Sequence, residues 1–217
     1  MSEEDFEQVL TRVPEENRSS DFWKSEIFFE RVRNWGRKRG HSEDLSRTFE
    51  DSPLAAVSVI LRPAADDTPE ILLLKRQTVE NDPWSGHISL PGGRARLGET
   101  PLQTAIRETT EEAGFDMTNW EIVGSLESVY PGNRSIKVKP FVVIAPGNVS
   151  VRVDQREIVD YFWPHLSYFS KSSNETPYIV SREGASFQTP SFVVMGNVVW
   201  GMTLRIILNL ISELKHS

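Results

Sequence analysis

Residues 93–115 read GRARLGETPLQTAIRETTEEAGF, and this stretch decides how the rest of the chain is interpreted. The part from Thr100 to Ala113 predicts an α-helix, because Pro101 is tolerated in a first helical turn and Gly114 readily terminates a helix. Apolar and small residues recur on one side of this helix at the spacing of a buried face, namely Leu102, Ala105, Ile106 and Thr109. The opposite side is left for polar chemistry.

Three glutamates project from that opposite side. Glu108, Glu111 and Glu112 stand at positions i, i+3 and i+4, which places them within about 100° of the helix circumference. Like charges at this spacing repel one another by a few tenths of a kcal/mol per pair. A hard divalent cation, Mg²⁺ or Mn²⁺, would turn the repulsion into ligation. The pattern therefore predicts a metal site, and Gly92-Gly93 just upstream allows the backbone to approach it closely.

The spacing of the fixed residues is more specific than any single residue. The pattern G-x5-E-x7-R-E-U-x-E-E-x-G-U is the Nudix box, and this chain matches all seven of its fixed positions with Gly93, Glu99, Arg107, Glu108, Glu111, Glu112 and Gly114. At ordinary residue usage, a chance match at one start position is on the order of 10⁻⁸ to 10⁻⁹. One departure is Thr109, where the box has a bulky aliphatic residue. The stretch thus resembles the Nudix hydrolase family.

The resemblance implies a role for each acid of the helix. Glu108 and Glu112 match the family's metal-binding glutamates, and Glu111 is implied to be a further ligand or the general base. The carbonyl of Gly93 is implied to be an additional ligand. Which carboxylate takes the proton from the attacking water stays open, since members of the family differ on this point.

Other residues of the motif have structural roles by the same resemblance. Glu99 and Arg107 are expected to form an ion pair that orients the loop against the helix, and Gly114 to end the helix. The family often recruits one more glutamate from a later loop, before a strand that contains a tryptophan. Glu157, six residues before Trp163, is the candidate for this catalytic position, and an exposed loop acid is the alternative interpretation.

The implied activity is hydrolysis of a diphosphate linkage in a nucleoside diphosphate derivative, with Mg²⁺ or Mn²⁺ as cofactor and a small anionic molecule as substrate. Two other functions are considered. Isopentenyl diphosphate isomerases share the fold, but they require cysteine chemistry and this chain has no cysteine. A non-catalytic binding module would be marked by the loss of Glu108, Glu111 or Glu112, and none is lost.

The interleaved strands and helices of the remaining chain predict an α/β (α+β) fold, and the resemblance implies its form, a Nudix-like α/β/α sandwich with a mixed sheet. Strands are expected at 55–61, 70–75, 87–90, 120–129, 136–144, 157–163, 178–180 and 192–195, and a closing helix at 198–214. Aromatic residues at helical spacing indicate an N-terminal helical extension at residues 1–50, followed by the hydrolase domain at 51–217. Packing, a homodimer contact and a substrate lid are the roles considered for the extension.

The composition limits partners and location. The net charge of −7 gives no general reason to bind nucleic acid, and the lack of cysteine excludes thiol catalysis and disulfides. The N-terminal MSEEDFEQVL is acidic where a signal peptide would be basic. Residues 198–214 are interrupted by polar side chains and are shorter than a membrane span. We therefore expect a cytoplasmic protein with no membrane partner.

The substrate is less well specified than the reaction. The chain is similar to the coenzyme A-cleaving branch of the family around Arg76 and Gly86, but Asp82 stands where that branch has a second arginine. Because Asp82 would repel the 3'-phosphate of coenzyme A, this substrate is kept as an alternative. The substrate-binding candidates are Arg76, Trp84 for stacking on a base, and His87 for a phosphate; Lys137 and Lys139 are further candidates for anionic contacts.

Overall fold

The computed structural model describes residues 20–39, 54–80, 85–131, 136–182 and 185–216. Trp84 and Asp82, both singled out above, lie outside these residues, and so does the proposed boundary between residues 50 and 51. The division into an extension and a hydrolase domain therefore stays a prediction.

The central sheet is built around β1 (Leu54–Pro63), a run of apolar residues that is buried on both faces over most of its length. β1 pairs in parallel with β7 (Lys137–Ile144) and antiparallel with β2 (Pro69–Ile71) and β5 (Gly92–Arg94). β6 (Glu121–Ser125) lies antiparallel on the other edge of β7. The sheet is mixed, as the resemblance implies.

A smaller sheet continues this layer. Its middle strand β3 (Leu73–Arg76) pairs antiparallel with β4 (Ile88–Ser89) and β8 (Ile158–Phe162). The two sheets are joined by the Leu72 N–H, which donates to the Ile60 carbonyl at 3.0 Å. The end of β3 therefore lies close to the central strand, and this brings Arg76 toward the glutamates of the predicted helix.

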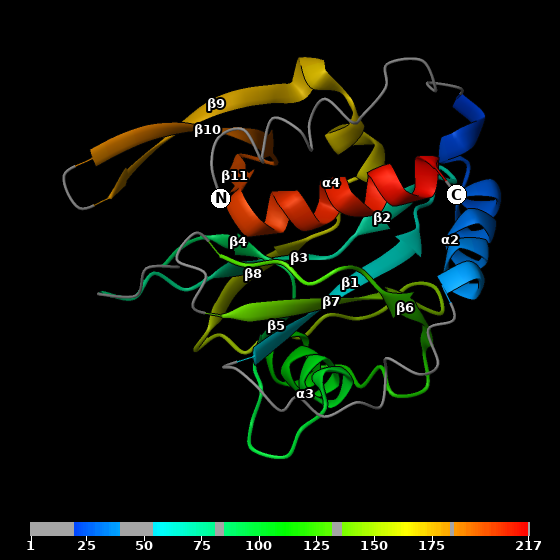
Figure 1. Ribbon diagram of the computed structural model, residues 1–217, viewed down its shortest axis with the longest axis horizontal. Helices are drawn as coiled ribbons and strands as arrows, with labels where there is room; N and C mark the ends of the chain where they lie inside the picture. Colours follow the sequence, from blue (N-terminus) through cyan, green and yellow to red (C-terminus); the bar gives the residue numbers. More distant parts are fainter. Residues whose placement is uncertain (1–19, 40–53, 81–84, 132–135, 183–184, 217) are drawn as a thin grey trace.

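Helices cover both faces of the sheet layer (Figure 1). α3 (Pro101–Ala113) packs on one face, where Ala56 and Ile60 of β1 share a buried cluster with Ala105. Residues of β1 with the opposite parity, such as Val57 and Val59, share the second cluster with α2 (Ser25–Arg39) and α4 (Gly201–Lys215). The α/β/α sandwich is thus confirmed, and the alternation along β1 produces its two cores.

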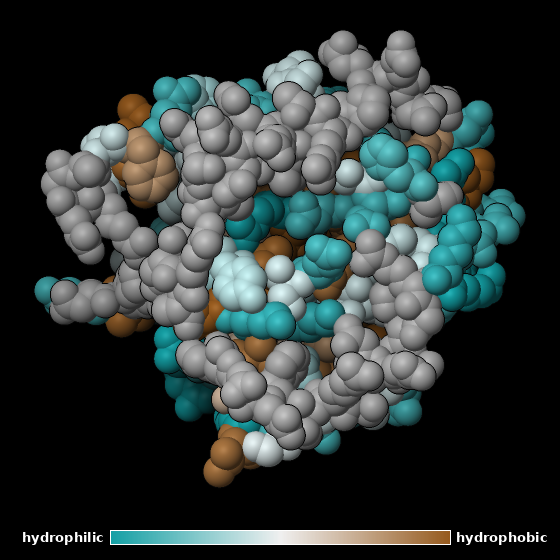
Figure 2. Space-filling model, viewed as in Figure 1, coloured by the Kyte–Doolittle hydropathy of each residue, from teal (hydrophilic) through white to brown (hydrophobic). Residues whose placement is uncertain are grey.

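The two helices of the second layer are held differently. α2 approaches β6 so closely that a Cβ on Gly36 would lie 2.5 Å from the Val123 side chain. The exposed side of α4 carries mainly hydrophilic side chains (Figure 2), while its other side is buried. Among the helices in the described part of the chain, none combines the length and the apolar composition of a membrane span.

An antiparallel ribbon of β9 (Glu175–Arg182), β10 (Ala185–Val194) and β11 (Asn197–Trp200) extends beyond α4 (Figure 1). Three short 3₁₀ turns complete the described elements, at Ser20–Trp23, Leu166–Ser170 and Ser172–Asn174. The ribbon and α4 together form the C-terminal part of the fold.

Three sequence predictions are wrong in detail. The closing helix begins at Gly201 rather than at residue 198, because Val198 and Val199 pair with β10 as part of β11. The single strand expected at 70–75 is divided at Leu72, where the chain passes from one sheet to the other. No strand is expected between residues 90 and 120, yet Gly92–Arg94 forms β5, paired with β1. In each case a tertiary partner overrides the local pattern.

The departure from the Nudix box at Thr109 has a partner in the structure. Thr109 is fully buried, and its Oγ1 lies 2.8 Å from the Oγ of Ser58, a buried residue of β1. Ser58 Oγ also donates to the Ala105 carbonyl at 3.4 Å. A hydroxyl pair therefore joins helix and strand at a position where the sequence pattern led us to expect an aliphatic contact.

This pair predicts strong coupling between the two positions. Thr109→Val and Ser58→Ala should each lower the free energy of unfolding by about 1–3 kcal/mol, because each leaves a buried hydroxyl poorly satisfied. The double variant should lose clearly less than the sum of the two. Urea unfolding of all four proteins measures this, and strictly additive losses would contradict the coupling.

Candidate active site

The site begins with the anchoring of the loop that precedes α3. The first turn is closed by a capping box, in which Thr100 Oγ1 accepts from the Gln103 N–H at 3.2 Å and Gln103 Oε1 accepts from the Thr100 N–H at 2.8 Å. The neighbouring Glu99 carboxylate accepts from the Arg96 N–H at 2.8 Å and from the Thr104 hydroxyl at 3.0 Å. These bonds fix where Glu99 points.

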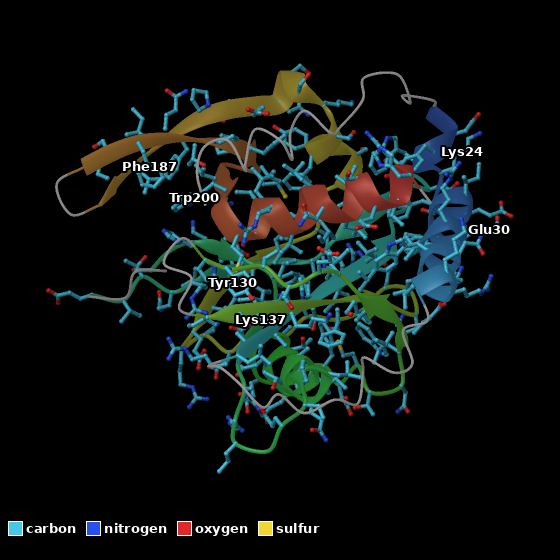
Figure 3. All side chains as sticks on the ribbon, viewed as in Figure 1. Lys24, Glu30, Tyr130, Lys137, Phe187 and Trp200 are labelled. Atoms are coloured by element: carbon cyan, nitrogen blue, oxygen red, sulfur yellow. The ribbon has the colours of Figure 1, made fainter. Side chains whose placement is uncertain are left out.

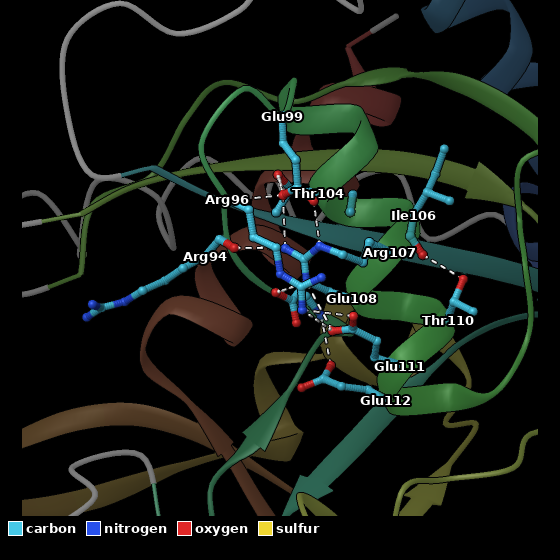
Figure 4. Close-up of polar contacts among 12 residues, drawn as sticks. Arg94, Arg96, Glu99, Thr104, Ile106, Arg107, Glu108, Thr110, Glu111 and Glu112 are labelled. Atoms are coloured by element: carbon cyan, nitrogen blue, oxygen red, sulfur yellow. Dashed lines mark hydrogen bonds and ion pairs between the residues drawn. The ribbon is translucent and has the colours of Figure 1, made fainter.

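Arg107 meets Glu99 through two parallel bonds, Nε to Oε1 at 2.6 Å and Nη2 to Oε2 at 3.0 Å (Figure 4). This bidentate geometry suits a guanidinium and a carboxylate. The hydrogen bond from Arg107, which outweighs the effect of burial, lowers the pKa of Glu99 from 4.5 to about 2. The structure therefore pairs the two residues to which the resemblance assigned a structural role.

Arg107 does more than hold Glu99. Its Nη1 donates to Glu108 Oε1 at 2.6 Å and to Glu111 Oε2 at 3.0 Å, and its Nη2 donates to the Arg94 carbonyl at 3.0 Å. One guanidinium thus contacts three carboxylates and the backbone of β5. The sequence interpretation identified only the contact with Glu99.

The glycine pair lets β5 pass directly over the acidic face of α3. A Cβ on Gly93 would lie 2.5–2.6 Å from the carboxylate atoms of Glu108, so no larger residue fits unless Glu108 moves. The Gly92 N–H donates to Glu112 Oε2 at 2.9 Å. Gly92 itself has φ of 151° and abuts the backbone of β1. Two glutamates of α3 thereby meet the backbone of β5.

Glu112 is the most deeply placed acid of this set, with only 2% of the residue exposed. Burial raises its pKa from 4.5 to about 8, the negative charges of Glu108 and Glu157 add to the rise, and the Gly92 N–H and Arg76 oppose it. Arg76 reaches it with Nη1 at 3.5 Å from Oε1. The exposed Glu157, just before β8, therefore acts electrostatically on the same group.

These acids are a suitable donor set for a divalent cation. Carboxylate oxygens of Glu108, Glu112 and Glu157 and the carbonyl of Gly93 are the hard ligands that Mg²⁺ and Mn²⁺ prefer, and a cation would relieve the burial of negative charge at Glu112. Among the described residues, however, no three acidic or histidine side chains already surround one point. Glu111 is instead held by Arg107 and by Arg96, whose Nη2 lies 3.0 Å from Oε1.

The other predicted residues have separate surroundings. His87 lies in the strand region beside Arg76, whose N–H donates to the His87 carbonyl at 3.0 Å, and the His87 ring packs edge-on against Trp200. Lys139 of β7 stands in register with Ala56, which is also the partner of Gly93. Lys137 precedes it by two residues and lies in register with Leu54.

Two features of the site were missed from the sequence. Arg96 occupies a variable position of the motif, so its contact with Glu111 left no signal. The second is the close packing at the end of α3. Gly114 has φ of 75°, and its N–H donates to the Thr110 carbonyl at 3.1 Å. It also leaves no room for a Cβ beside the Arg152 backbone.

The Glu99 and Arg107 pair predicts a specific pH dependence. Because the folded-state pKa of Glu99 is lowered to about 2, its contribution to stability is full above about pH 4.5 and is lost as the pH falls toward 2. Glu99→Gln should therefore lower the free energy of unfolding by about 2 kcal/mol at pH 7, and this deficit should shrink below pH 4.5.

Urea unfolding between pH 2 and 7 measures this deficit. Glu121→Gln is the matched control, because Glu121 pairs with Arg33 in an exposed ion pair, which contributes little to stability. A Glu99→Gln deficit that stays constant over the whole pH range would contradict the role of the carboxylate charge.

Comparison with known proteins places this site in a family. The family model for the NUDIX domain matches residues 52–178. Nudix hydrolase 3 of Caenorhabditis elegans is 35% identical over 88 residues, which cover 41% of this chain and 37% of that protein. Mitochondrial coenzyme A diphosphatase NUDT8 of Mus musculus is 25% identical over 154 residues, which cover 70% of this chain and 73% of that protein.

The fold also matches a solved structure. A MutT/nudix family protein from Enterococcus faecalis aligns with a TM-score of 0.51 at 15% identity, and the match covers 85% of this chain and 73% of that one. The chain spans about a third of the length of the first two curated relatives it matches, 32% and 37%. The matched family model spans more than half of the 217 residues and contains the whole acidic motif, so the chain belongs to the Nudix family.

Proposed function

We propose that this chain is a hydrolase that cleaves a diphosphate linkage in a nucleoside diphosphate derivative and depends on Mg²⁺ or Mn²⁺. The observation that supports this most is the meeting of β5 and α3, where the Gly93 backbone contacts the Glu108 carboxylate and the Gly92 N–H bonds Glu112. Hard oxygen donors from the Glu108 and Glu112 carboxylates thus lie where β5 passes over α3. The family relationship supports the same reaction.

The proposed reaction gives each residue of the motif a separate role. Glu108, Glu112 and the Gly93 carbonyl would hold the metal, and Glu157 would complete the set. Arg107 orients Glu108 and Glu111 through its Nη1. A bound cation would screen the diphosphate and lower the pKa of a water.

Two acids are candidates for the general base, Glu111 and Glu157. Glu111 is half-exposed and is held in position by Arg96 and Arg107, and Glu157 is exposed near Glu112. Either carboxylate can take a proton from water at its own oxygen. Arg76, which lies beside Glu112, would bind the negatively charged part of the substrate.

Coenzyme A remains the alternative substrate, because the mouse relative is named a coenzyme A diphosphatase. The opposing argument is Asp82 at the position where that branch has an arginine. A cytoplasmic location is likewise our proposal, and the mouse relative is named as mitochondrial. A homodimer contact is one of the roles proposed for the N-terminal extension.

The proposed reaction predicts turnover in a substrate panel with Mg²⁺. Coenzyme A, ADP-ribose, NADH, dinucleoside polyphosphates and nucleoside triphosphates are assayed with the wild type and with Glu112→Gln. We expect at least one substrate to be cleaved, and the variant to be roughly 100-fold slower, because several kcal/mol of charge stabilisation are lost. Its stability should not fall, since a neutral amide replaces a buried acid.

Glu121→Gln serves as the surface control for this assay and should retain wild-type activity. Unchanged turnover by Glu112→Gln would reject the metal-site assignment. No turnover of any panel member by the wild type would favour the binding-module alternative.

The contact between Gly93 and Glu108 predicts a second variant. Gly93→Ala should weaken Mn²⁺ binding and lower turnover, because the new Cβ displaces the Glu108 carboxylate. The matched test is Glu108→Gln alone and together with Gly93→Ala. If both act through the same carboxylate, the double variant loses little more than Glu108→Gln. Electron paramagnetic resonance of Mn²⁺ gives the affinities, and fully additive losses would count against the contact.

A further inference from the structure

Three aromatic side chains meet where the ribbon joins α4. The Trp200 ring lies 5.2 Å from the His87 ring, at 73° to it, and 5.3 Å from the Tyr178 ring, at 45°. The three residues come from β11, from the chain just before β4, and from β9. Each is partly exposed to solvent. We refer to Trp200, His87 and Tyr178 as the aromatic platform.

The indole of Trp200 is held in place by its surroundings. Trp200 pairs with Ser191 of β10, and Tyr178 pairs with Thr189 two residues away, so both side chains stand on the same face of the ribbon. Directly after Trp200, the Thr203 hydroxyl donates to the Ile88 carbonyl at 3.0 Å and fixes the start of α4 on β4. A ring fixed in this way loses little entropy when a ligand stacks on it.

A short series of contacts joins the platform to the catalytic acids. The His87 carbonyl accepts from the Arg76 N–H at 3.0 Å, and the Arg76 guanidinium lies 3.5 Å from Glu112. Residues opposite one another on neighbouring strands are about 5 Å apart. The platform is therefore separated from the candidate metal ligands by one pair of neighbouring strands and by the Arg76 side chain.

We propose that the aromatic platform binds the base of the substrate, with Trp200 as the stacking surface and the diphosphate lying at Arg76 and the glutamates. The inference rests on the proposed function and adds to it the recognition of the base. Stacking is tolerant of base identity, so the platform would favour substrates with an aromatic base over those without one. Trp200 lies beyond residue 178, where the family match ends, so the main ring belongs to the C-terminal part of this chain.

The ribbon carries a control residue for this proposal. Phe187 of β10 is 48% exposed and lies farther out along the ribbon than Trp200. In Figure 3, Trp200 lies between Phe187 and Tyr130. Tyr130 stays close to the first turns of α4, since its carbonyl accepts from Arg205 Nη2 at 2.5 Å. If the exposed apolar face of the ribbon bound another copy of the chain instead, replacing Phe187 and replacing Trp200 would have similar effects.

The test compares AMP with ribose 5-phosphate, which lacks the base, by isothermal titration calorimetry on the full chain. Trp200→Ala should weaken AMP binding roughly tenfold or more, the scale of a lost base–aromatic stack, and leave ribose 5-phosphate unchanged. Trp200→Phe should recover most of the affinity, and Phe187→Ala should remain within about twofold of the wild type. Thermal unfolding of each variant reports whether it folds.

Three results would overturn the platform: wild-type AMP binding no tighter than ribose 5-phosphate binding, an equal loss for both ligands in Trp200→Ala, or equal effects of Trp200→Ala and Phe187→Ala. If Trp200→Ala does not fold, the comparison of Trp200→Phe with Trp200→Leu decides, because only the aromatic replacement should keep the preference for AMP. AMP binding requires no turnover. An inactive wild type that binds AMP through Trp200 would therefore reject the hydrolase and retain the platform.

Discussion

The site depends on the contacts that the Arg107 guanidinium makes with its neighbours. This guanidinium bonds Glu99 bidentately, reaches Glu108 and Glu111 with a third nitrogen, and contacts the Arg94 carbonyl. Loop, helix and β5 are thereby tied to one planar cation. Without it, several acids on one helix face would repel one another and the loop before α3 would lose its main anchor. The arrangement of the glutamates is therefore a property of the ion-pair network as much as of the helix.

The same region shows how a functional site departs from the rules of stable packing. Glu112 is buried among other acids, and its raised pKa records the cost of keeping a charge there. The buried hydroxyl pair of Thr109 and Ser58 lies on the core side of the same helix. α3 thus combines a core face that tolerates polar contacts, provided they are paired, with an outer face whose charges would be stabilised by the proposed cation.

The proposed reaction and the proposed recognition of the base meet at one strand pair. β3 and β4 belong to the small sheet, yet Arg76 reaches the acids of α3 while His87 beside it touches Trp200 at the start of α4. One strand pair therefore borders both the place of chemistry and the proposed place of base recognition. With the base bound as proposed, variation in the ribbon and α4 would change the substrate without disturbing Arg107 or the glutamates, as is common when binding residues stand on appendages of a rigid scaffold.

The sequence by itself determined the local geometry of the motif, because that geometry follows from residue spacing: the helix from Pro101 to Ala113, the shared face of Glu108, Glu111 and Glu112, and the stop at Gly114. The alternation of strands and helices also predicted a sheet covered by helices, and the resemblance supplied the layer order. Only the tertiary structure decided that Gly92-Gly93 forms a strand over Glu108, that Thr109 meets Ser58, and that Trp200 ends a strand instead of lying in a helix. These features depend on residues far apart in the chain, and no local periodicity records which of them will become neighbours.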